Sequence, residues 1–345
     1  MKSLRDEVNL KYFRAQIIQT VLFEVTHRCP SDCIHCLLLK TPKDELTLDE
    51  IENLFHQLRD EGTVNIGLSG GEPFMRKDFP EILELAARDN FFLTLVTTGT
   101  MINHHEVNLL LKSRVRNVEI SLLGANSATH DTIMRFSGAF NRMIKAVNLL
   151  RDNGIGVLLK TTVLRQNKQE LPAMAKLAHE LKVGFQSNIS VLPQENGDCT
   201  IQELALSEDE VAGLDPSLVY GGLIPGENLK DGAILACTAG ITNAGISPQG
   251  DIFPCIILRY KIGNIRNRTL KDIWHDNPDP FLSRLREFQE EDAAECFNCK
   301  LKPFCRRCPG SVYLETGDIG KPSPASCVLA KGLMRAYNAY QRRCP

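Results

Sequence analysis

With 345 residues, 43% of them hydrophobic and 24% charged, the chain has the composition of an ordinary globular protein and room for one large and one smaller domain. Its net charge of −2 argues against a phosphate-binding surface, and no apolar run reaches the length of a membrane span. The N-terminus lacks the apolar segment of a secretion signal. We therefore expect a cytoplasmic protein with no nucleic-acid partner and no membrane span.

Strand-like and helix-like segments alternate from about residue 20 to residue 192. The apolar, strand-like runs lie at residues 21–25, 64–68, 91–96, 118–123, 157–163 and 184–191. Segments with helical periodicity lie at residues 48–59, 79–87, 106–112, 140–151 and 171–181, and Thr47 stands where an N-cap is expected. This βα order predicts an α/β fold with a parallel sheet. Six strands are too few for a closed eight-stranded barrel, which leaves an open sheet or a partial barrel.

The βα rhythm stops after Pro193. Residues 194–232 contain several Gly-containing turn dipeptides and one helix-like insert at residues 207–213, which is typical of a connecting region. Residues 241–258 then read as a β-hairpin whose turn lies at residues 248–251, and a short helix follows at residues 270–274. The C-terminal part is therefore predicted to be small and irregular.

Twelve cysteines are the strongest anomaly in the composition. In a reducing compartment, clustered cysteines are metal ligands or reactive thiols and not disulfides. One set lies within residues 29–36 and a larger set within residues 237–327, while Cys199 and Cys344 fall outside both sets. Metal chemistry is therefore predicted in two separate regions of the chain.

The first set has the sequence CPSDCIHC, directly after the strand-like run TVLFEVT. It consists of Cys29, Cys33 and Cys36, which we call the front group. A zinc site would need a fourth ligand from elsewhere. An iron–sulfur cluster held by three thiolates would instead keep one iron open to a further ligand. The CxxxCxxC spacing after the first strand of a βα domain resembles the radical S-adenosylmethionine (radical SAM) enzymes.

This resemblance implies a [4Fe–4S] cluster whose open iron binds the amino and carboxylate groups of SAM, and whose electron cleaves SAM to methionine and a 5′-deoxyadenosyl radical. It also requires a Gly-Gly-Glu turn after the second strand. The matching segment is VNIGLSGGEP, with Ser69, Gly70, Gly71 and Glu72. Glycines let the backbone approach the ligand closely, and the carboxylate of Glu72 suits an ammonium group.

Three further residues match SAM-contacting positions of the family. Ser121 ends the fourth strand in VEISLLG, where the family more often has Ser-x-Asp-Gly. Arg135 follows the His-Asp pair in HDTIMR and matches a residue that holds the SAM carboxylate. His35 stands beside Cys36, where the family often has an aromatic residue near the adenine.

The downstream cysteines resemble the SPASM extension, a cysteine-rich domain found behind many radical SAM barrels. The order is Cys237, Gly250 and Cys255, followed by a C-x2-C-x5-C-x2-C run and a final Cys327. The last spacing of that run is one residue shorter than usual. By this resemblance Cys237, Cys255 and Cys308 (the first rear group) hold one auxiliary [4Fe–4S] cluster, and Cys296, Cys299, Cys305 and Cys327 (the second rear group) hold another. A zinc ribbon is the alternative for this spacing.

Together these features predict a partial (βα)6 radical SAM barrel at residues 17–215 and a SPASM domain with a β-hairpin and short helices at residues 216–345. The implied cofactors are SAM and three [4Fe–4S] clusters, reduced by a low-potential donor such as a ferredoxin or flavodoxin. The different-class alternative is a non-catalytic iron–sulfur electron carrier or a zinc-binding protein. Neither explains the SAM-contacting set.

The resemblance leaves two substrate classes open. The favoured one is a ribosomally made peptide that undergoes an oxidative modification such as a crosslink. About twenty residues precede the first strand, too few for a leader-binding domain, so recognition would need a separate protein or the mouth of the barrel. The other candidate is a tetrapyrrole, decarboxylated at its propionates as in a haem pathway.

Overall fold

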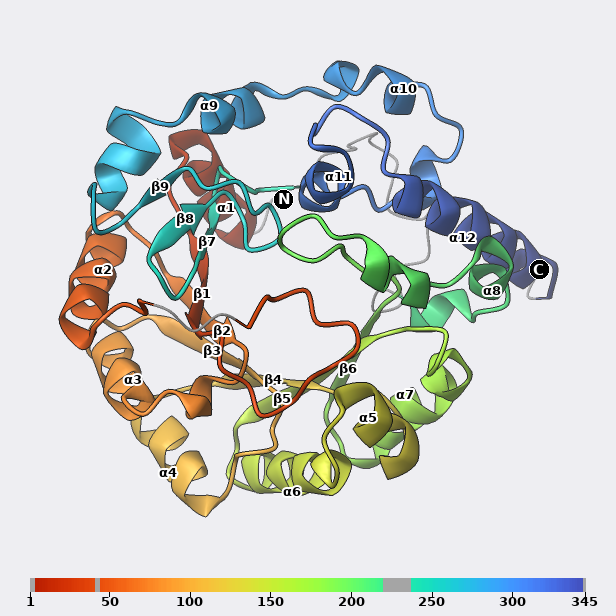
Figure 1. Ribbon diagram of the computed structural model, residues 1–345, viewed down its shortest axis with the longest axis horizontal. Helices are drawn as coiled ribbons and strands as arrows, with labels where there is room; N and C mark the ends of the chain where they lie inside the picture. Colours follow the sequence, from red (N-terminus) through yellow and green to blue (C-terminus); the bar gives the residue numbers. More distant parts are fainter. Residues whose placement is uncertain (1–3, 41–43, 220–236, 344–345) are drawn as a thin grey trace.

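The computed structural model describes residues 4–40, 44–219 and 237–343, and it confirms the predicted α/β fold (Figure 1). All six expected strands are present and pair in parallel in the order of the chain. They are β1 (Thr20–Thr26), β2 (Asn65–Gly70), β3 (Phe92–Thr97), β4 (Asn117–Ser121), β5 (Gly156–Thr162) and β6 (Gly184–Asn188). β1 and β6 do not pair with each other, so the sheet stays open as a partial barrel.

Five helices cover the outer face of this sheet, as Figure 1 shows, and all five were expected from the sequence. They are α2 (Leu48–Asp60), α3 (Phe79–Arg88), α4 (His104–Lys112), α6 (Ala139–Asp152) and α7 (Leu171–Glu180). Thr47 is confirmed as an N-cap, in a reciprocal capping box with Glu50. The main hydrophobic core lies between these helices and the sheet, because alternate strand residues such as Val118 and Ile120 are fully buried.

Two helices in the N-terminal half of the chain were not expected from the sequence. α1 (Leu4–Ala15) precedes β1 and has no buried residue. α5 (Ser127–Met134) lies between β4 and α6, with the sequence SATHDTIM. Its apolar residues are too few for a clear helical period, yet it buries His130, Ile133 and Met134. Tertiary packing therefore stabilises α5 where local pattern does not.

The predicted hairpin is confirmed and extends the same sheet. It is formed by β7 (Asn243–Ile246) and β8 (Asp251–Phe253), and β9 (Gly263–Asn264) pairs with β8. β7 lies parallel to β1, with Val21 opposite Ala244. The sheet order is consequently β6-β5-β4-β3-β2-β1-β7-β8-β9. The cysteine-rich part is thus joined to the barrel by backbone hydrogen bonds next to the strand that leads into the front group.

The remaining chain is mostly short helices, as expected for this region, and they curve around one side of the barrel in Figure 1. They are α8 (Glu208–Ala212), a π-helix η6 (Asp272–Asp276), α9 (Pro280–Glu287), α10 (Ala294–Phe297), α11 (Pro309–Thr316) and α12 (Pro324–Arg343). Single 3₁₀ turns lie at η1 (Pro73–Met75), η2 (Lys168–Glu170), η3 (Thr200–Leu204), η4 (Pro216–Leu218), η7 (Glu290–Asp292) and η8 (Lys302–Phe304).

The twenty-residue helix α12 was not expected, and it packs against α8. None of the helices in the described ranges combines the length and the apolarity that a membrane crossing requires.

Candidate functional site

The loop that follows β1 carries the front group. Its backbone is tied to the C-terminal end of α5: the amide of Asp32 donates to the carbonyl of Met134 at 3.2 Å, and the amide of Ile34 donates to that of Ile133 at 3.1 Å. Cys33 and Ile34 also pack on the small apolar cluster that contains Ile133 and Met134. The unexpected helix α5 is therefore the support on which the cysteine loop rests.

The Gly-Gly-Glu turn at the end of β2 lies directly against the chain that leads into Cys29. The amide of Gly71 donates to the carbonyl of Thr26, and the amide of Glu72 donates to that of Arg28, both at 2.8 Å. A Cβ atom on Gly70 would lie 2.1 Å from the Thr26 oxygen, and one on Gly71 would lie 2.4 Å from the Arg28 oxygen. Both glycines are required for this contact, because any side chain would clash with backbone.

The carboxylate of Glu72 is fully buried, and hydroxyl and amide groups of Thr97 and Thr98 surround it. Thr97 Oγ1 donates at 2.8 Å, and Thr98 donates through its amide at 2.9 Å and its Oγ1 at 2.5 Å. Burial raises the pKa of Glu72, against the opposing effect of the hydrogen bonds from Thr98 and Thr97. Among the described residues no Lys, Arg or His forms an ion pair with it. A buried carboxylate without a cationic partner favours its protonated form, in agreement with the raised pKa.

Ser121 ends β4 and lies opposite Lys160 of β5 in the sheet register. It stands on the face away from the helices, because its neighbour Ile120 is buried among them. Ser69 is half-buried on β2. Both serines lie near the C-terminal ends of parallel strands. They are therefore at the edge of the sheet where the front group is found.

Arg135 and His35 are also brought to the cysteine loop. Arg135 pairs with Asp32 of that loop at 3.1 Å, with both side chains exposed, and Lys40 pairs with the same carboxylate at 2.9 Å. His35 is held inside the loop, where burial lowers its pKa to about 4 and keeps the imidazole neutral. Arg135 therefore contacts Asp32 of the cysteine loop in this structure. This partner was not predicted from the sequence.

The thiols of the front group are in a poorly solvated environment. The pKa of Cys33 is raised to about 12, first by burial and then by the charges of Cys36 and Cys29. The pKa of Cys29 is raised by burial, and the negative charge of Glu72 adds to this effect. Metal binding must therefore displace protons from these sulfurs. Three sulfur donors within eight residues, in a poorly solvated environment, fit iron–sulfur ligation, which uses thiolates.

Two of the rear cysteines have pKa values that burial and neighbouring thiols raise. The pKa of Cys237 is raised to about 11, by burial and by the charges of Cys308 and Cys255. The pKa of Cys305 is likewise raised to about 11, by burial and by the charges of the other three members of the second rear group. Cys199 is exposed and joins neither group, and Cys344 lies outside the described residues.

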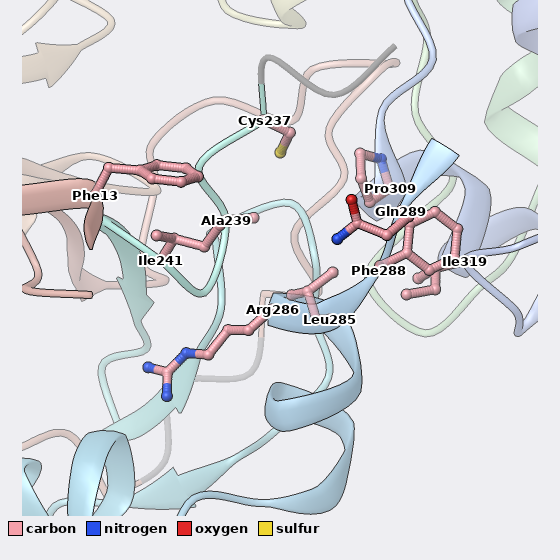
Figure 2. Close-up of a pocket in the computed structure, with 10 residues that line it drawn as sticks. All are labelled: Phe13, Cys237, Ala239, Ile241, Leu285, Arg286, Phe288, Gln289, Pro309 and Ile319. Atoms are coloured by element: carbon pink, nitrogen blue, oxygen red, sulfur yellow. The ribbon is translucent and has the colours of Figure 1, made fainter. Parts of the chain in front are cut away.

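A cavity of about 380 Å³ opens beside Cys237 (Figure 2). Its lining is mostly apolar and comes from α1, α9 and the segments around β7 and α11: Phe13, Cys237, Ala239, Ile241, Leu285, Arg286, Phe288, Gln289, Pro309 and Ile319. The guanidinium of Arg286 is used by the protein itself, because it donates to the carbonyls of Gly240 at 2.7 Å and Trp274 at 2.8 Å. The first rear group thus borders an apolar space.

The His-Asp pair that precedes Arg135 has structural partners. His130 is fully buried, and its Nδ1 accepts the amide of Leu123 at 3.1 Å, while burial lowers its pKa to about 4. Asp131 accepts the amides of Gly138 at 2.7 Å and Phe140 at 2.9 Å, at the start of α6. The pair joins the end of β4 to α5 and α6.

Two ion pairs near the site were missed from the sequence. Lys160 contacts Glu119 at 2.8 Å, on the same face of β4 and β5 as Ser121. Arg259 contacts Glu24 of β1 through both of its Nη nitrogens, inside the protein. A charged residue within the apolar run TVLFEVT was a usable signal for Glu24, since buried carboxylates need partners.

Family models match both regions of the chain. The Radical SAM superfamily model matches residues 23–178, and the SPASM model, described as an iron-sulfur cluster-binding domain, matches residues 237–309. These ranges contain the front group and the rear cysteines up to Cys308.

Curated relatives and solved structures resemble most of the chain. The AdoMet-dependent heme synthase of Methanosarcina barkeri is 27% identical and is matched over 90% of this chain and 97% of its own. The PqqA peptide cyclase of Rhizobium meliloti is 28% identical, over 88% of this chain and 85% of its own. The structure of Streptococcus suis SuiB bound to its precursor peptide SuiA has the same fold, with a TM-score of 0.72 at 18% identity, covering 94% of this chain and 80% of that chain. This chain therefore carries a Radical SAM domain followed by a C-terminal SPASM domain.

Proposed function

We propose that this protein cleaves SAM reductively and uses the resulting 5′-deoxyadenosyl radical to abstract hydrogen from a substrate. The front group would hold the [4Fe–4S] cluster, which supplies the electron and an open coordination position. The observation that carries the proposal is the contact of the Gly-Gly-Glu turn with the chain entering Cys29, which sets the buried carboxylate of Glu72 beside the cysteine loop. Glu72 then binds the ammonium group of SAM, and Ser121 and Arg135 contact the rest of its methionine part.

The test is SAM cleavage by the anaerobically reconstituted protein. With three [4Fe–4S] clusters the chain should contain about twelve irons. Replacing Cys29, Cys33 or Cys36 with Ala should abolish formation of 5′-deoxyadenosine, because one of only three ligands is lost. Cys199→Ala is the matched control, since Cys199 is exposed and outside all three groups, and it should keep full activity. Cleavage by a front-group variant without its cluster would contradict the proposal.

A zinc protein or a simple electron carrier makes different predictions. About four irons with one or two zincs would support a zinc module at the rear. An electron carrier would have a reduced cluster whose EPR spectrum SAM leaves unchanged.

For the substrate we propose a ribosomally made peptide that becomes oxidised. The similarity to the PqqA peptide cyclase over 88% of this chain supports this class. A crosslink removes two electrons from the peptide. Clusters held by the two rear groups would accept at least one of these electrons. The test is the mass of a co-expressed candidate peptide, for which a loss of two hydrogens is expected.

A second substrate class is supported by the similarity to the AdoMet-dependent heme synthase, which extends over 97% of that protein. In this case a porphyrin propionate would lose carbon dioxide. Release of carbon dioxide from a porphyrin, together with unchanged mass of every candidate peptide, would favour this reaction and contradict the first. In both cases Cys237→Ala or Cys255→Ala should leave SAM cleavage largely intact while product formation stops.

A further inference from the structure

An ion pair between Glu24 and Arg259 lies at the junction of the barrel and the SPASM region. Arg259 Nη1 contacts Glu24 Oε2 at 2.8 Å, and Nη2 contacts Oε1 at 2.5 Å, the two-pronged geometry that arginine forms with carboxylates. The side chains are only 4% and 5% exposed. Because Glu24 is in β1 and Arg259 follows Cys255, the pair connects segments that are 235 residues apart.

Each end of this pair continues toward one cysteine group. Glu24 Oε2 lies 3.1 Å from Nε2 of His27, which stands two residues before Cys29. Burial alone would raise the pKa of Glu24, but the hydrogen bond with His27 and the charge of Arg259 outweigh it and hold the pKa below its usual value. At the other end, Arg259 stands four residues after Cys255 in the sequence. The contacts of Glu24 with His27 and Arg259 therefore link the strand that leads into the front group with the segment that follows Cys255.

A second carboxylate ties Arg259 to the far side of the front loop. Glu195 lies 3.6 Å from Arg259 Nη1, and its Oε1 accepts the amide of Leu39 at 2.7 Å. The amide of Glu195 donates to the carbonyl of Leu37 at 3.0 Å. Arg259 thus contacts β1, before the front group, directly, and it is connected through Glu195 to residues 37–39, after the front group.

Stability alone does not account for such a pair. Taking two charges out of water costs several kcal/mol per ion, and well-packed apolar residues often serve equally well or better. The pair instead contributes a defined geometry, because a two-pronged contact fixes both the orientation and the distance of its partners. In addition, the Nε–H of Arg259 is buried and has no partner among the described residues, which leaves a donor for a cluster sulfur.

We propose that Arg259 is a positioning residue that holds the first auxiliary cluster in a fixed place relative to the SAM cluster and tunes its reduction potential. This inference rests on the proposed clusters and goes beyond the proposed reaction. The Glu24 contact sets the geometry between the two cysteine groups. The positive charge and the Nε–H favour the reduced, more negative state of the auxiliary cluster.

The test compares three variants of the reconstituted protein by two measurements. Pulsed EPR gives the magnetic coupling between the reduced SAM and first auxiliary clusters, which reports geometry. A redox titration gives the midpoint potential of the auxiliary cluster, which reports charge. Arg259→Met should change both measurements. The distribution of coupling strengths should become broader, and the midpoint potential should fall. Arg259→Lys keeps the charge but not the two-pronged contact, so it should restore most of the potential and leave the coupling broadened.

The double variant Glu24→Met/Arg259→Met removes both charges and leaves no unpaired buried ion, which protects it against unfolding. We expect a broader distribution of coupling strengths in this variant. The midpoint potential of its auxiliary cluster should be nearer to that of the unmodified protein. Arg76→Met is the matched control, because Arg76 is also 4% exposed but donates to Val25 and Leu46 within the barrel alone. It should lower the melting temperature without changing the auxiliary-cluster potential.

Unchanged coupling and potential in all Arg259 variants, in a protein that holds about twelve irons and cleaves SAM, would overturn the positioning role and leave the proposed reaction standing. A protein without the front cluster, or one unable to cleave SAM, would overturn both. A melting temperature lowered equally in Arg259→Met and Arg76→Met, with no spectroscopic difference between them, would mean that the pair serves packing only.

Discussion

Thr97 Oγ1 lies 2.8 Å from each carboxylate oxygen of Glu72, at the end of a strand neighbouring the one that Glu72 follows. This contact holds the carboxylate in one orientation without neutralising it. A hydroxyl group can donate only one proton, so Thr97 orients both oxygens while it donates to one of them at a time. The relationship explains why a fully buried acid occurs in the turn beside the front group.

Replacing Glu72 with Gln should weaken SAM binding about 10-fold to 100-fold, because hydrogen bonds to charged groups contribute about 1.5–3 kcal/mol. The measurement is a SAM titration of the reconstituted protein, followed by the EPR spectrum of the reduced cluster. Glu210→Gln is the control, since the Glu210 carboxylate pairs with Lys168 and caps α8. Equal SAM affinity in the two variants would show that Glu72 does not bind the ammonium group.

The buried position of Glu72 also predicts a pH effect on stability. Because the pKa of Glu72 is raised above its usual value of 4.5, the folded state holds this proton more tightly than the unfolded state. The stability that the group contributes is complete below pH 4.5 and is lost as the pH rises toward the folded-state pKa. Glu72→Gln does not titrate. In urea unfolding of the cluster-free protein, the variant should therefore gain on the unmodified protein between pH 4.5 and neutrality. A difference that is constant with pH would contradict the raised pKa.

Arg135 can exchange its loop partner for the SAM carboxylate at little cost. Its pair with Asp32 is exposed on both sides, and such pairs contribute about 0–1 kcal/mol. We expect Arg135→Ala to raise the dissociation constant of SAM about tenfold. Asp32→Ala, which frees Arg135, should leave that constant unchanged or lower it. If both variants weaken SAM binding equally, Arg135 acts only by holding the cysteine loop.

Cys33 should be the least reactive thiol of the front loop in the cluster-free protein. With its pKa raised to about 12 by burial and by its neighbouring thiols, only about one molecule in ten thousand carries the thiolate at pH 8. Cys199 is exposed and should be alkylated first. Peptide mapping after timed treatment with iodoacetamide measures both rates. Unfolding in urea should remove the difference, and equal rates in the folded protein would show that Cys33 is not protected.

The sequence by itself determined the alternation of strands and helices, the parallel sheet and the division of the cysteines into front and rear sets. These features depend on residues close together in the chain: apolar periods within single elements, Thr47 as an N-cap, and the spacing of thiols within short segments. The same spacing, through its family resemblance, predicted the SAM-contacting set.

Only the tertiary structure decided which partners meet across the chain. The polar helix α5 has no clear period of its own, and it forms because its buried residues pack under the cysteine loop. Arg135 pairs with Asp32, which is 103 residues away, and Arg259 pairs with Glu24 across 235 residues. β7 pairs with β1, which places the SPASM region against the barrel. No local pattern contains this information, because the energy of a buried charge or a polar helix depends on what packs around it once the whole chain has folded.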